Sequence, residues 1–307
     1  MKHIFTLLLI SLLGVSNVQA QTVTVHRTNG TSVTFSAADI KSIEFAPAAQ
    51  LIKKFTGYIT VESKFFSPTY YGDSARVEVY AIGDKFQCRF HDGQWGDGEF
   101  NVTMDRGQIS GNGTLTIKNP HNGTAKSYEA TISGPMAAVS VTVPTLMSGT
   151  TIKWTHGEPT EAVKLSATYS GENSVMVTSY FGPYKAANSL YKVTANADGT
   201  INVALPTEMY KNTPIGHLTL GSFTVSNIAY SEAEKAYVRN YAADGLKVHF
   251  KAEADGTVAK DQDYGFTKAK IVVTPGADGT ITIVNEYTLG QMPMPITATY
   301  QGTKVLR

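Results

Sequence analysis

The sequence predicts an all-β protein built from two antiparallel barrels in tandem, preceded by a small β-hairpin unit. Short runs that alternate apolar and polar residues recur about 8–12 residues apart, the spacing expected of a sandwich or barrel. Gly, Thr, Tyr and Phe are abundant, and long helix-forming runs are missing. The phrase Ala-Thr-Tyr-x-Gly occurs at 167–171 and again at 298–302, and residues 54–58 are a weaker relative. These Gly-containing strands divide the chain into a first barrel at 51–171 and a second barrel at 172–307.

Residues 1–20 have the pattern of a cleaved signal peptide. A basic start precedes an apolar run at 4–15, and Val18 and Ala20 supply small residues at −3 and −1 before Gln21. The apolar run is too short for a transmembrane anchor, which needs about 20 apolar residues. No cysteine follows Ala20, so the usual bacterial lipid anchor is not expected. We predict export to the periplasm, the cell surface or the medium.

Charge and cysteine content exclude several classes of partner and bond. The chain carries 26 Lys and Arg against 25 Asp and Glu, a balance that indicates neither a nucleic-acid partner nor an anionic membrane surface. No stretch after the signal peptide is apolar enough to span a bilayer. Cys88 is the only cysteine, so no intrachain disulfide can form. Strand alternation places it on the same face as Phe86 and Phe90, which favours a buried thiol with an apolar packing role.

Residues 21–50 form the small N-terminal β unit and its linker. Apolar residues from Val23 to Phe35 alternate with polar ones around the Asn29-Gly30 turn, which is a strong hairpin signal. A third short strand is expected at 39–45, and residues 46–50 have the composition of a linker. The whole pattern resembles a short N-terminal segment common in secreted proteins of the Bacteroidetes.

The two larger units repeat the same style of strands and turns. In the first, strands are expected at 58–61, 74–90, 99–104, 109–117, 128–132, 139–143, 151–154 and 163–169. In the second, they are expected at 174–179, 190–205 as a hairpin over Asp198-Gly199, 217–228 and 296–302. Ser231 and Glu234 match a helix capping box, but the flanking Tyr and Val residues favour a loop between two strands.

Residues 214–228, Pro-Ile-Gly-His-Leu-Thr-Leu-Gly-Ser-Phe-Thr-Val-Ser-Asn-Ile, and the closing Pro-Ile-Thr-Ala-Thr-Tyr-Gln-Gly at 295–302 resemble the calycin-like β-barrel domains of secreted Bacteroidetes proteins. The resemblance covers the second unit well and the first loosely. It implies an up-and-down antiparallel barrel of about eight strands, related in architecture to lipocalins, with no catalytic signature. The Gly-x-Trp found at the first strand of true lipocalins occurs here only at 93–95, in a turn.

An eight-stranded barrel is either filled by side chains or wide enough to hold one small ligand. We therefore predict an exported, non-enzymatic binding protein that holds a small apolar or amphipathic, lipid-like ligand, by preference in the second barrel. The alternative is a structural or adhesive cell-surface protein with solid barrels that contacts partners through its outer faces. Aromatic residues combine apolar area with a polar tip. The candidates to line a ligand site are Tyr180, Phe181, Tyr184, Tyr230, Tyr237 and Tyr241, although strands are rich in such residues anyway.

Motifs for metals and catalysis are incomplete. The run Asp261-Gln-Asp-Tyr-Gly265 begins like a calcium loop, but Val272 stands where a bidentate Glu is required. His156 and Glu158 resemble part of a deaminase zinc site, which also needs a pair of cysteines. No serine-hydrolase, P-loop or dinucleotide fingerprint occurs. We predict no catalytic residue, no metal and no cofactor.

One short motif suggests a covalent modification. Asp73-Ser74-Ala75 resembles the Asp-Ser/Thr-small or apolar site at which Bacteroidetes O-glycosylate exported proteins, and it follows a plausible turn at 70–72. Ser74 is therefore a candidate for O-glycosylation.

Overall fold

The computed structural model describes residues 22–26, 29–42, 48–119, 122–178, 181–292 and 294–306, and nearly all regular structure in these ranges is β. The chain divides into two compact units, residues 1–48 and 49–307. The predicted signal peptide lies outside the described residues. No helix in the described ranges is long and apolar enough to cross a membrane.

The small unit is the predicted hairpin. Strands β1 (Thr22–His26) and β2 (Ser32–Ser36) pair antiparallel, with Val23 opposite Phe35. The third strand expected at 39–45 begins differently, because residues 37–39 form the 3₁₀ turn η1 (Ala37–Asp39) and residues 40–42 are not in a strand. Residues 43–47 lie outside the described ranges.

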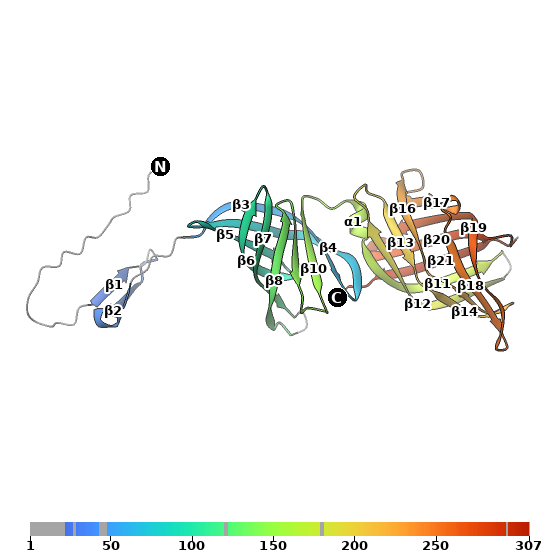
Figure 1. The fold of residues 1–307 in the computed structure, drawn as a ribbon, viewed down its shortest axis with the longest axis horizontal. Coiled ribbons are helices and arrows are strands. Elements are labelled where there is room, and N and C mark those ends of the chain that lie inside the picture. The colour runs from blue at the N-terminus through green and yellow to red at the C-terminus, as the bar shows by residue number, and fades with distance from the viewer. Residues whose placement is uncertain are drawn as a thin grey trace, which may run out of the picture. The chain divides into compact units, whose positions relative to one another are not determined.

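The first barrel is a closed, up-and-down antiparallel ring in which every strand pairs with its neighbours in sequence (Figure 1). Strand β10 returns to pair with β3 and closes the ring. The strands are β3 (Gln50–Ser63), β4 (Phe66–Ile82), β5 (Lys85–Asp92), β6 (Gly96–Asp105), β7 (Gln108–Lys118), β8 (Ala125–Pro135), β9 (Ala138–Val143) and β10 (Thr150–His156).

Side chains fill the interior of the first barrel. Alternate residues of each strand point inward and form one apolar cluster that includes the fully buried rings of Phe90, Trp95, Phe100 and Trp154. Cys88 belongs to this cluster, which confirms the predicted buried thiol. Its burial raises the pKa of the thiol to about 12.

A short helix, not a strand, follows the first barrel. The strand expected at 163–169 was wrong in its first half, because residues 161–165 form α1 (Glu161–Leu165). The Thr160 hydroxyl accepts a hydrogen bond from the Val163 amide and caps the helix. Ala162 and Leu165 are buried in the core of the second barrel. The helix therefore covers one end of that barrel (Figure 1).

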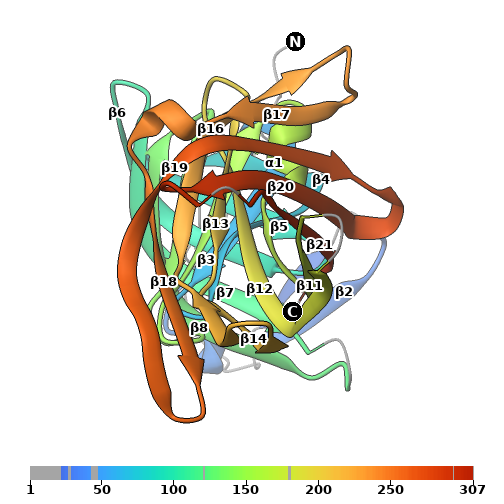
Figure 2. The same cartoon turned by 90° about the vertical axis from the view of Figure 1, so that its right-hand side faces the viewer.

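The second barrel is a larger ring. Strands β11, β12, β13, β16, β17, β19, β20 and β21 follow one another around it, and pairing between β19 and β20 closes it (Figure 2). Strands β14, β15 and β18 extend the sheet from β19. The strands are β11 (Ala167–Val177), β12 (Phe181–Ala195), β13 (Ile201–Leu205), β14 (Glu208–Thr213), β15 (Gly216–Leu220), β16 (Phe223–Ser231), β17 (Ala236–Asn240), β18 (Lys247–Ala254), β19 (Thr257–Pro275), β20 (Thr280–Leu289) and β21 (Ile296–Lys304). The turn between β16 and β17 confirms the loop expected after Ser231.

Three long strands of this barrel are interrupted in the middle. The pairs β13 and β14, β15 and β16, and β17 and β18 are each separated by a few residues, so that six short strands serve as three long ones. Pro206, which cannot donate a backbone hydrogen bond, lies in the first break. Gly221 lies in the second, where an added Cβ would stand 2.7 Å from the His249 Cβ. If each interrupted pair is counted as one strand, the second barrel also has eight strands, as predicted.

The recurring Ala-Thr-Tyr-x-Gly phrase marks the closure of one barrel, not the ends of two. Strand β11 runs across the boundary expected at 171/172 and pairs with both β12 and β21. The two copies of the phrase are therefore adjacent, with Gly171 opposite Gly302. A Cβ on Gly171 would lie 1.9 Å from the Gln301 carbonyl oxygen, so close strand approach requires glycine there, whereas a Cβ on Gly302 would meet the Tyr300 ring of its own strand. The first barrel closes earlier in the chain, with β10.

Hydrogen bonds connect β4 to Ser166, the residue just before β11, and to β21, the last strand of the second barrel. The Tyr70 amide donates to the Ser166 carbonyl at 2.9 Å. The Lys304 ammonium group donates to the Tyr70 carbonyl at 2.8 Å. Burial lowers the pKa of Lys304 to about 8.

Candidate functional site

A polar cluster lies inside the second barrel, whereas the buried polar residues inside the first barrel are the threonines Thr69 and Thr150. Asn173 comes from β11, Tyr191 from β12, and Glu208 and Tyr210 from β14. All four are buried; the exposed fraction is 2% for Asn173 and 7% for Glu208. A β-bulge between Gly171 and Asn173 adjusts the register of β11 at this level.

The strand break after β13 turns Glu208 inward. Ile201, Val203 and Leu205 are buried along β13, so an unbroken strand would next bury residues 207 and 209. The break at 206–207 shifts this phase, and Glu208 and Tyr210 are buried in place of Thr207 and Met209. The same break therefore places a carboxyl group in the barrel core.

Three donors converge on one oxygen of the Glu208 carboxylate. The Asn173 amide nitrogen Nδ2 donates to Oε2 at 2.6 Å, the Tyr191 hydroxyl donates at 3.4 Å, and the Tyr210 hydroxyl donates through a short hydrogen bond. Asn173 Nδ2 also lies 2.9 Å from each of the two tyrosine hydroxyls. The four side chains thus form a single connected network.

Two acceptors of this network have no partner. Glu208 Oε1 and Asn173 Oδ1 are buried and make no hydrogen bond with any described residue. Within the described ranges Glu208 also forms no ion pair with a Lys, Arg or His side chain. Burying an ionised carboxylate without a cation costs several kcal/mol of folding free energy. Burial of Glu208 therefore costs folding free energy, and the packing of the core alone does not explain why the chain bears this cost.

Tyr300 packs against one tyrosine of the cluster, and burial changes the acidity of both tyrosines in it. Tyr191 stacks on Tyr300 with ring centroids 3.9 Å apart and planes inclined by 18°. Burial, and then the nearby Glu208 carboxylate, raise the pKa of both Tyr191 and Tyr210 far above the ordinary value. Both phenols therefore keep their protons and remain able to donate to Glu208.

A second buried polar pair lies on the β20 side of the barrel. The Tyr241 hydroxyl donates to Asn285 Oδ1 at 2.8 Å, and Asn285 Nδ2 is buried without a partner among the described residues. Tyr241 also packs edge-to-face against Phe266, with ring centroids 5.1 Å apart.

The six aromatic residues expected to line a ligand site do not gather in one place. Tyr180 lies outside the described residues. Phe181, about half exposed, and Tyr184, half-buried, lie near the start of β12. Tyr230 and Tyr237 contact each other at 5.2 Å on the β16–β17 hairpin, at the end of those strands farthest from Phe181. Tyr241 is fully buried between these two groups.

Sequence reasoning missed Glu208 and Asn173. Glu208 is the only charged residue between Ile201 and Tyr210, which is the one signal that would have found it. Alternation counted from Ile201 places it on the outer face, so the break after Leu205 hid its true direction.

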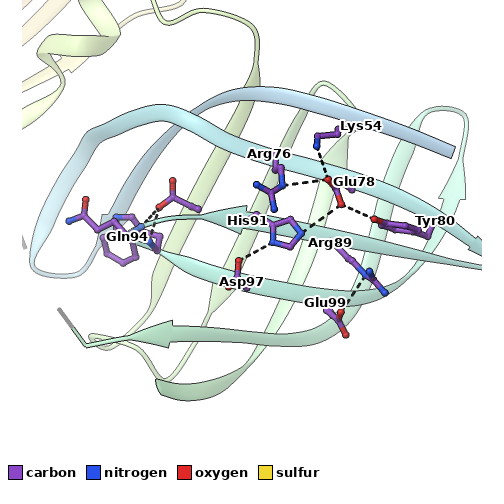
Figure 3. Close-up of polar contacts among 11 residues, drawn as sticks. Lys54, Arg76, Glu78, Tyr80, Arg89, His91, Gln94, Asp97 and Glu99 are labelled. Carbon is purple, nitrogen blue, oxygen red and sulfur yellow. Dashed lines mark hydrogen bonds and ion pairs between the residues drawn. The ribbon is translucent and has the colours of Figure 1, made fainter. Parts of the chain in front are cut away.

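The first barrel carries a polar network on its outer face, centred on Glu78 (Figure 3). Glu78 pairs with Lys54 Nζ at 3.3 Å, with Arg76 Nε at 3.4 Å and with His91 Nε2 at 3.8 Å, and it accepts a hydrogen bond from Tyr80 at 2.8 Å. Burial raises the pKa of Glu78, but the hydrogen bonds from Tyr80 and Lys54 outweigh burial and leave the pKa below its usual value. This carboxylate is as buried as Glu208 but fully paired.

A surface hollow of about 280 Å³ adjoins this network. Its lining includes Ser74, Arg76, Asp97 and Lys118. Ser74, the candidate for O-glycosylation, is exposed at its edge.

No three His, Cys, Asp or Glu side chains gather into a metal-binding group within the described ranges. The residues that begin like a calcium loop, Asp261 to Gly265, lie in strand β19 and pair with β18. Asp261 and Asp263 each contact His249, at 3.1 and 3.0 Å.

Comparison with known proteins identifies part of the chain. Residues 165–303 match the family model of the calycin-like beta-barrel domain. The second barrel is a calycin-like domain. No curated protein matches the chain.

Two solved structures are similar to this protein to different degrees. A candidate outer membrane protein from Bacteroides fragilis has a TM-score of 0.54 and 21% identity, covering 82% of this chain and 97% of that one. Because 82% of the chain exceeds either barrel, the shared fold extends beyond the calycin-like barrel. The match to a mutant of transferrin binding protein B from Haemophilus parasuis covers 85% of this chain and 77% of that one. Its identity is 7% and its TM-score is 0.22, too low to indicate a shared fold.

Proposed function

We propose that this protein is an exported, non-enzymatic binding protein that holds a small amphipathic ligand inside its calycin-like second barrel. The observation that carries the proposal is the pair of buried, unpartnered acceptors on Glu208 and Asn173. Groups of this kind are costly in a core that serves only for packing, and they are common where a ligand supplies the missing partner.

The contrast between the barrels supports the choice of the second. The interior of the first is filled by apolar side chains, including two tryptophans. The interior of the second combines the polar cluster with apolar residues of neighbouring strands, such as Val175 and Ala186. A ligand with a polar end and a short apolar part matches this combination.

Export is supported by the signal-peptide pattern of residues 1–20, with Gln21 as the first residue of the mature protein. The protein then acts in the periplasm, at the cell surface or in the medium. The chain offers no complete motif for catalysis, which is why a binding role is preferred to an enzymatic one.

The test is native mass spectrometry of the mature protein purified from its own cell envelope, without detergent or denaturant. We expect a complex of one protein with one small molecule, and loss of that molecule on unfolding. Ala186→Leu, which enlarges a side chain inside the second barrel, should reduce the bound fraction at least fivefold. Ala130→Leu, a matched change inside the first barrel, should leave it unchanged.

Each variant must first show a cooperative thermal transition. If nothing accompanies the wild-type protein, the carrier function is wrong and the structural or adhesive alternative takes its place. The same spectra report the mass of any glycan at Ser74, with Ser74→Ala as the control.

A further inference from the structure

We propose that the ligand of the second barrel carries a cationic ammonium group, which Glu208 and Asn173 bind. This inference rests on the proposed function and names the chemistry of the ligand's polar end. The site consists of Glu208 Oε1 and Asn173 Oδ1, with the hydroxyls of Tyr191 and Tyr210 beside them.

The unpartnered atoms of this cluster are both acceptors. The orientation of the Asn173 amide follows from its neighbours, because Nδ2 donates to the Glu208 carboxylate and a flipped amide would place two oxygens together. Glu208 can only accept when ionised. The missing partner is therefore a donor, and an ammonium group offers three donors and no acceptor.

The charge of the cluster points the same way. Glu78, with 8% of its surface exposed, is balanced by Lys54 and Arg76, whereas Glu208, with 7% exposed, has no Lys or Arg partner among the described residues. A buried carboxylate is stable when a cation is paired with it and hydrogen-bonded. A positively charged ligand group would supply that pair.

The set of donor atoms favours an organic cation over a metal ion. The cluster offers one carboxylate and one amide oxygen, fewer charged oxygen ligands than calcium sites contain. Val175, Ala186 and Leu218 belong to the same core, so the ammonium group would carry a short apolar chain.

The experiment compares three six-carbon probes that differ only in the head group: n-hexylammonium, n-hexanoate and 1-hexanol. Calorimetry and thermal shifts are measured at neutral pH on the mature protein after removal of any co-purified molecule. We expect n-hexylammonium to bind at least tenfold more tightly than either other probe. Glu208→Gln, which keeps the shape but removes the charge, should abolish that preference. Glu78→Gln, the matched change in the first barrel, should preserve it.

The outcomes separate this inference from the proposed function. If the three probes bind equally, or if Glu208→Gln retains the ammonium preference, the cationic ligand is wrong while a carrier function still stands on co-purification. If n-hexylammonium does not bind, the inference is overturned. If Na⁺, K⁺, Mg²⁺ or Ca²⁺ raises the melting temperature through Glu208 and the organic cation does not, the site belongs to a metal ion and the ammonium assignment is overturned.

Discussion

At the scale of single residues, the partners of a buried group decide its chemistry more than its residue type or its burial does. Glu78 and Glu208 are similarly buried carboxyl groups, but long cationic side chains from β3 and β4 pair only with the first. The Glu78 network satisfies itself and needs no ligand. Glu208 Oε1 accepts no hydrogen bond from any described residue, and this is the atom that the proposed ligand would pair with.

Cys88 gives a prediction at this scale. Because burial raises the pKa of its thiol to about 12, the thiolate is scarce in the folded protein, and we expect no reaction with a disulfide reagent at pH 8. The thiol should react within minutes after unfolding in urea. Since the folded pKa lies above the unfolded value of about 8.5, the stability that this group contributes is present below that value and is lost as pH rises toward 12. Rapid, complete reaction of the folded protein would contradict the buried position.

At the scale of elements, the sequence predicted strands well and their grouping less well. The recurrence of Ala-Thr-Tyr-x-Gly was interpreted as the last strand of each barrel, whereas β11 and β21 are the first and last strands of one barrel. The two glycines are needed for different local reasons, the close approach of β21 at Gly171 and the Tyr300 ring at Gly302. Similarity of that kind does not reveal which strands pair.

Local hydrogen bonds explain the other difference between expectation and structure. Residues 163–165 have strand-compatible side chains, but the Thr160 cap and the Glu161–Lys164 ion pair stabilise a helical turn. Burial of Leu165 in the second barrel adds a tertiary contact that no local pattern reports. The Asp255-Gly256 turn, by contrast, depends on a local signal, the Asp-Gly pair, and both its residues have the positive φ of a type I′ turn.

Gly171 gives the prediction for elements. Gly171→Ala would place a Cβ 1.9 Å from the Gln301 carbonyl oxygen and force β11 away from β21, so we expect a loss of about 3 kcal/mol in the free energy of unfolding. Gly265→Ala is the matched control in the same barrel, because its Cβ would meet nothing closer than 4.0 Å. That control should change stability by less than about 0.5 kcal/mol. Urea unfolding followed by tryptophan and tyrosine fluorescence measures both; equal stability of the two variants would contradict the strand contact.

At the scale of the whole molecule, the all-β class and both eight-stranded barrels could be predicted because alternation and turn residues are local signals. The candidate site could not be predicted, because it depends on the interruptions in the long strands of the second barrel. Tyr241, named from sequence, is buried in the same barrel as Glu208, but the residues that distinguish this barrel are polar ones. Their inward direction follows from a phase change at Pro206 that becomes visible only once the strands are paired.

Lys304 provides the prediction for the whole molecule, because it joins the last strand of the second barrel to the first barrel through the Tyr70 carbonyl. Burial lowers its folded pKa to about 8, below the unfolded value of about 10.4, so the unfolded chain binds more protons between these values. The cost of burying the charge is fully present below pH 8 and is relieved as pH rises toward 10.4. Lys304→Met removes this cost at every pH and also removes the hydrogen bond.

We therefore expect the stability of Lys304→Met, relative to wild type, to fall by about 1 kcal/mol from pH 7.5 to pH 10, a value reduced by partial exposure of the ammonium group. Taking the difference between the two proteins cancels the opposite contribution of Cys88. Lys153→Met, at an exposed lysine of the first barrel, should show no such trend. Equal pH dependence of both variants would mean that Lys304 is solvated and does not hold β21 against β4.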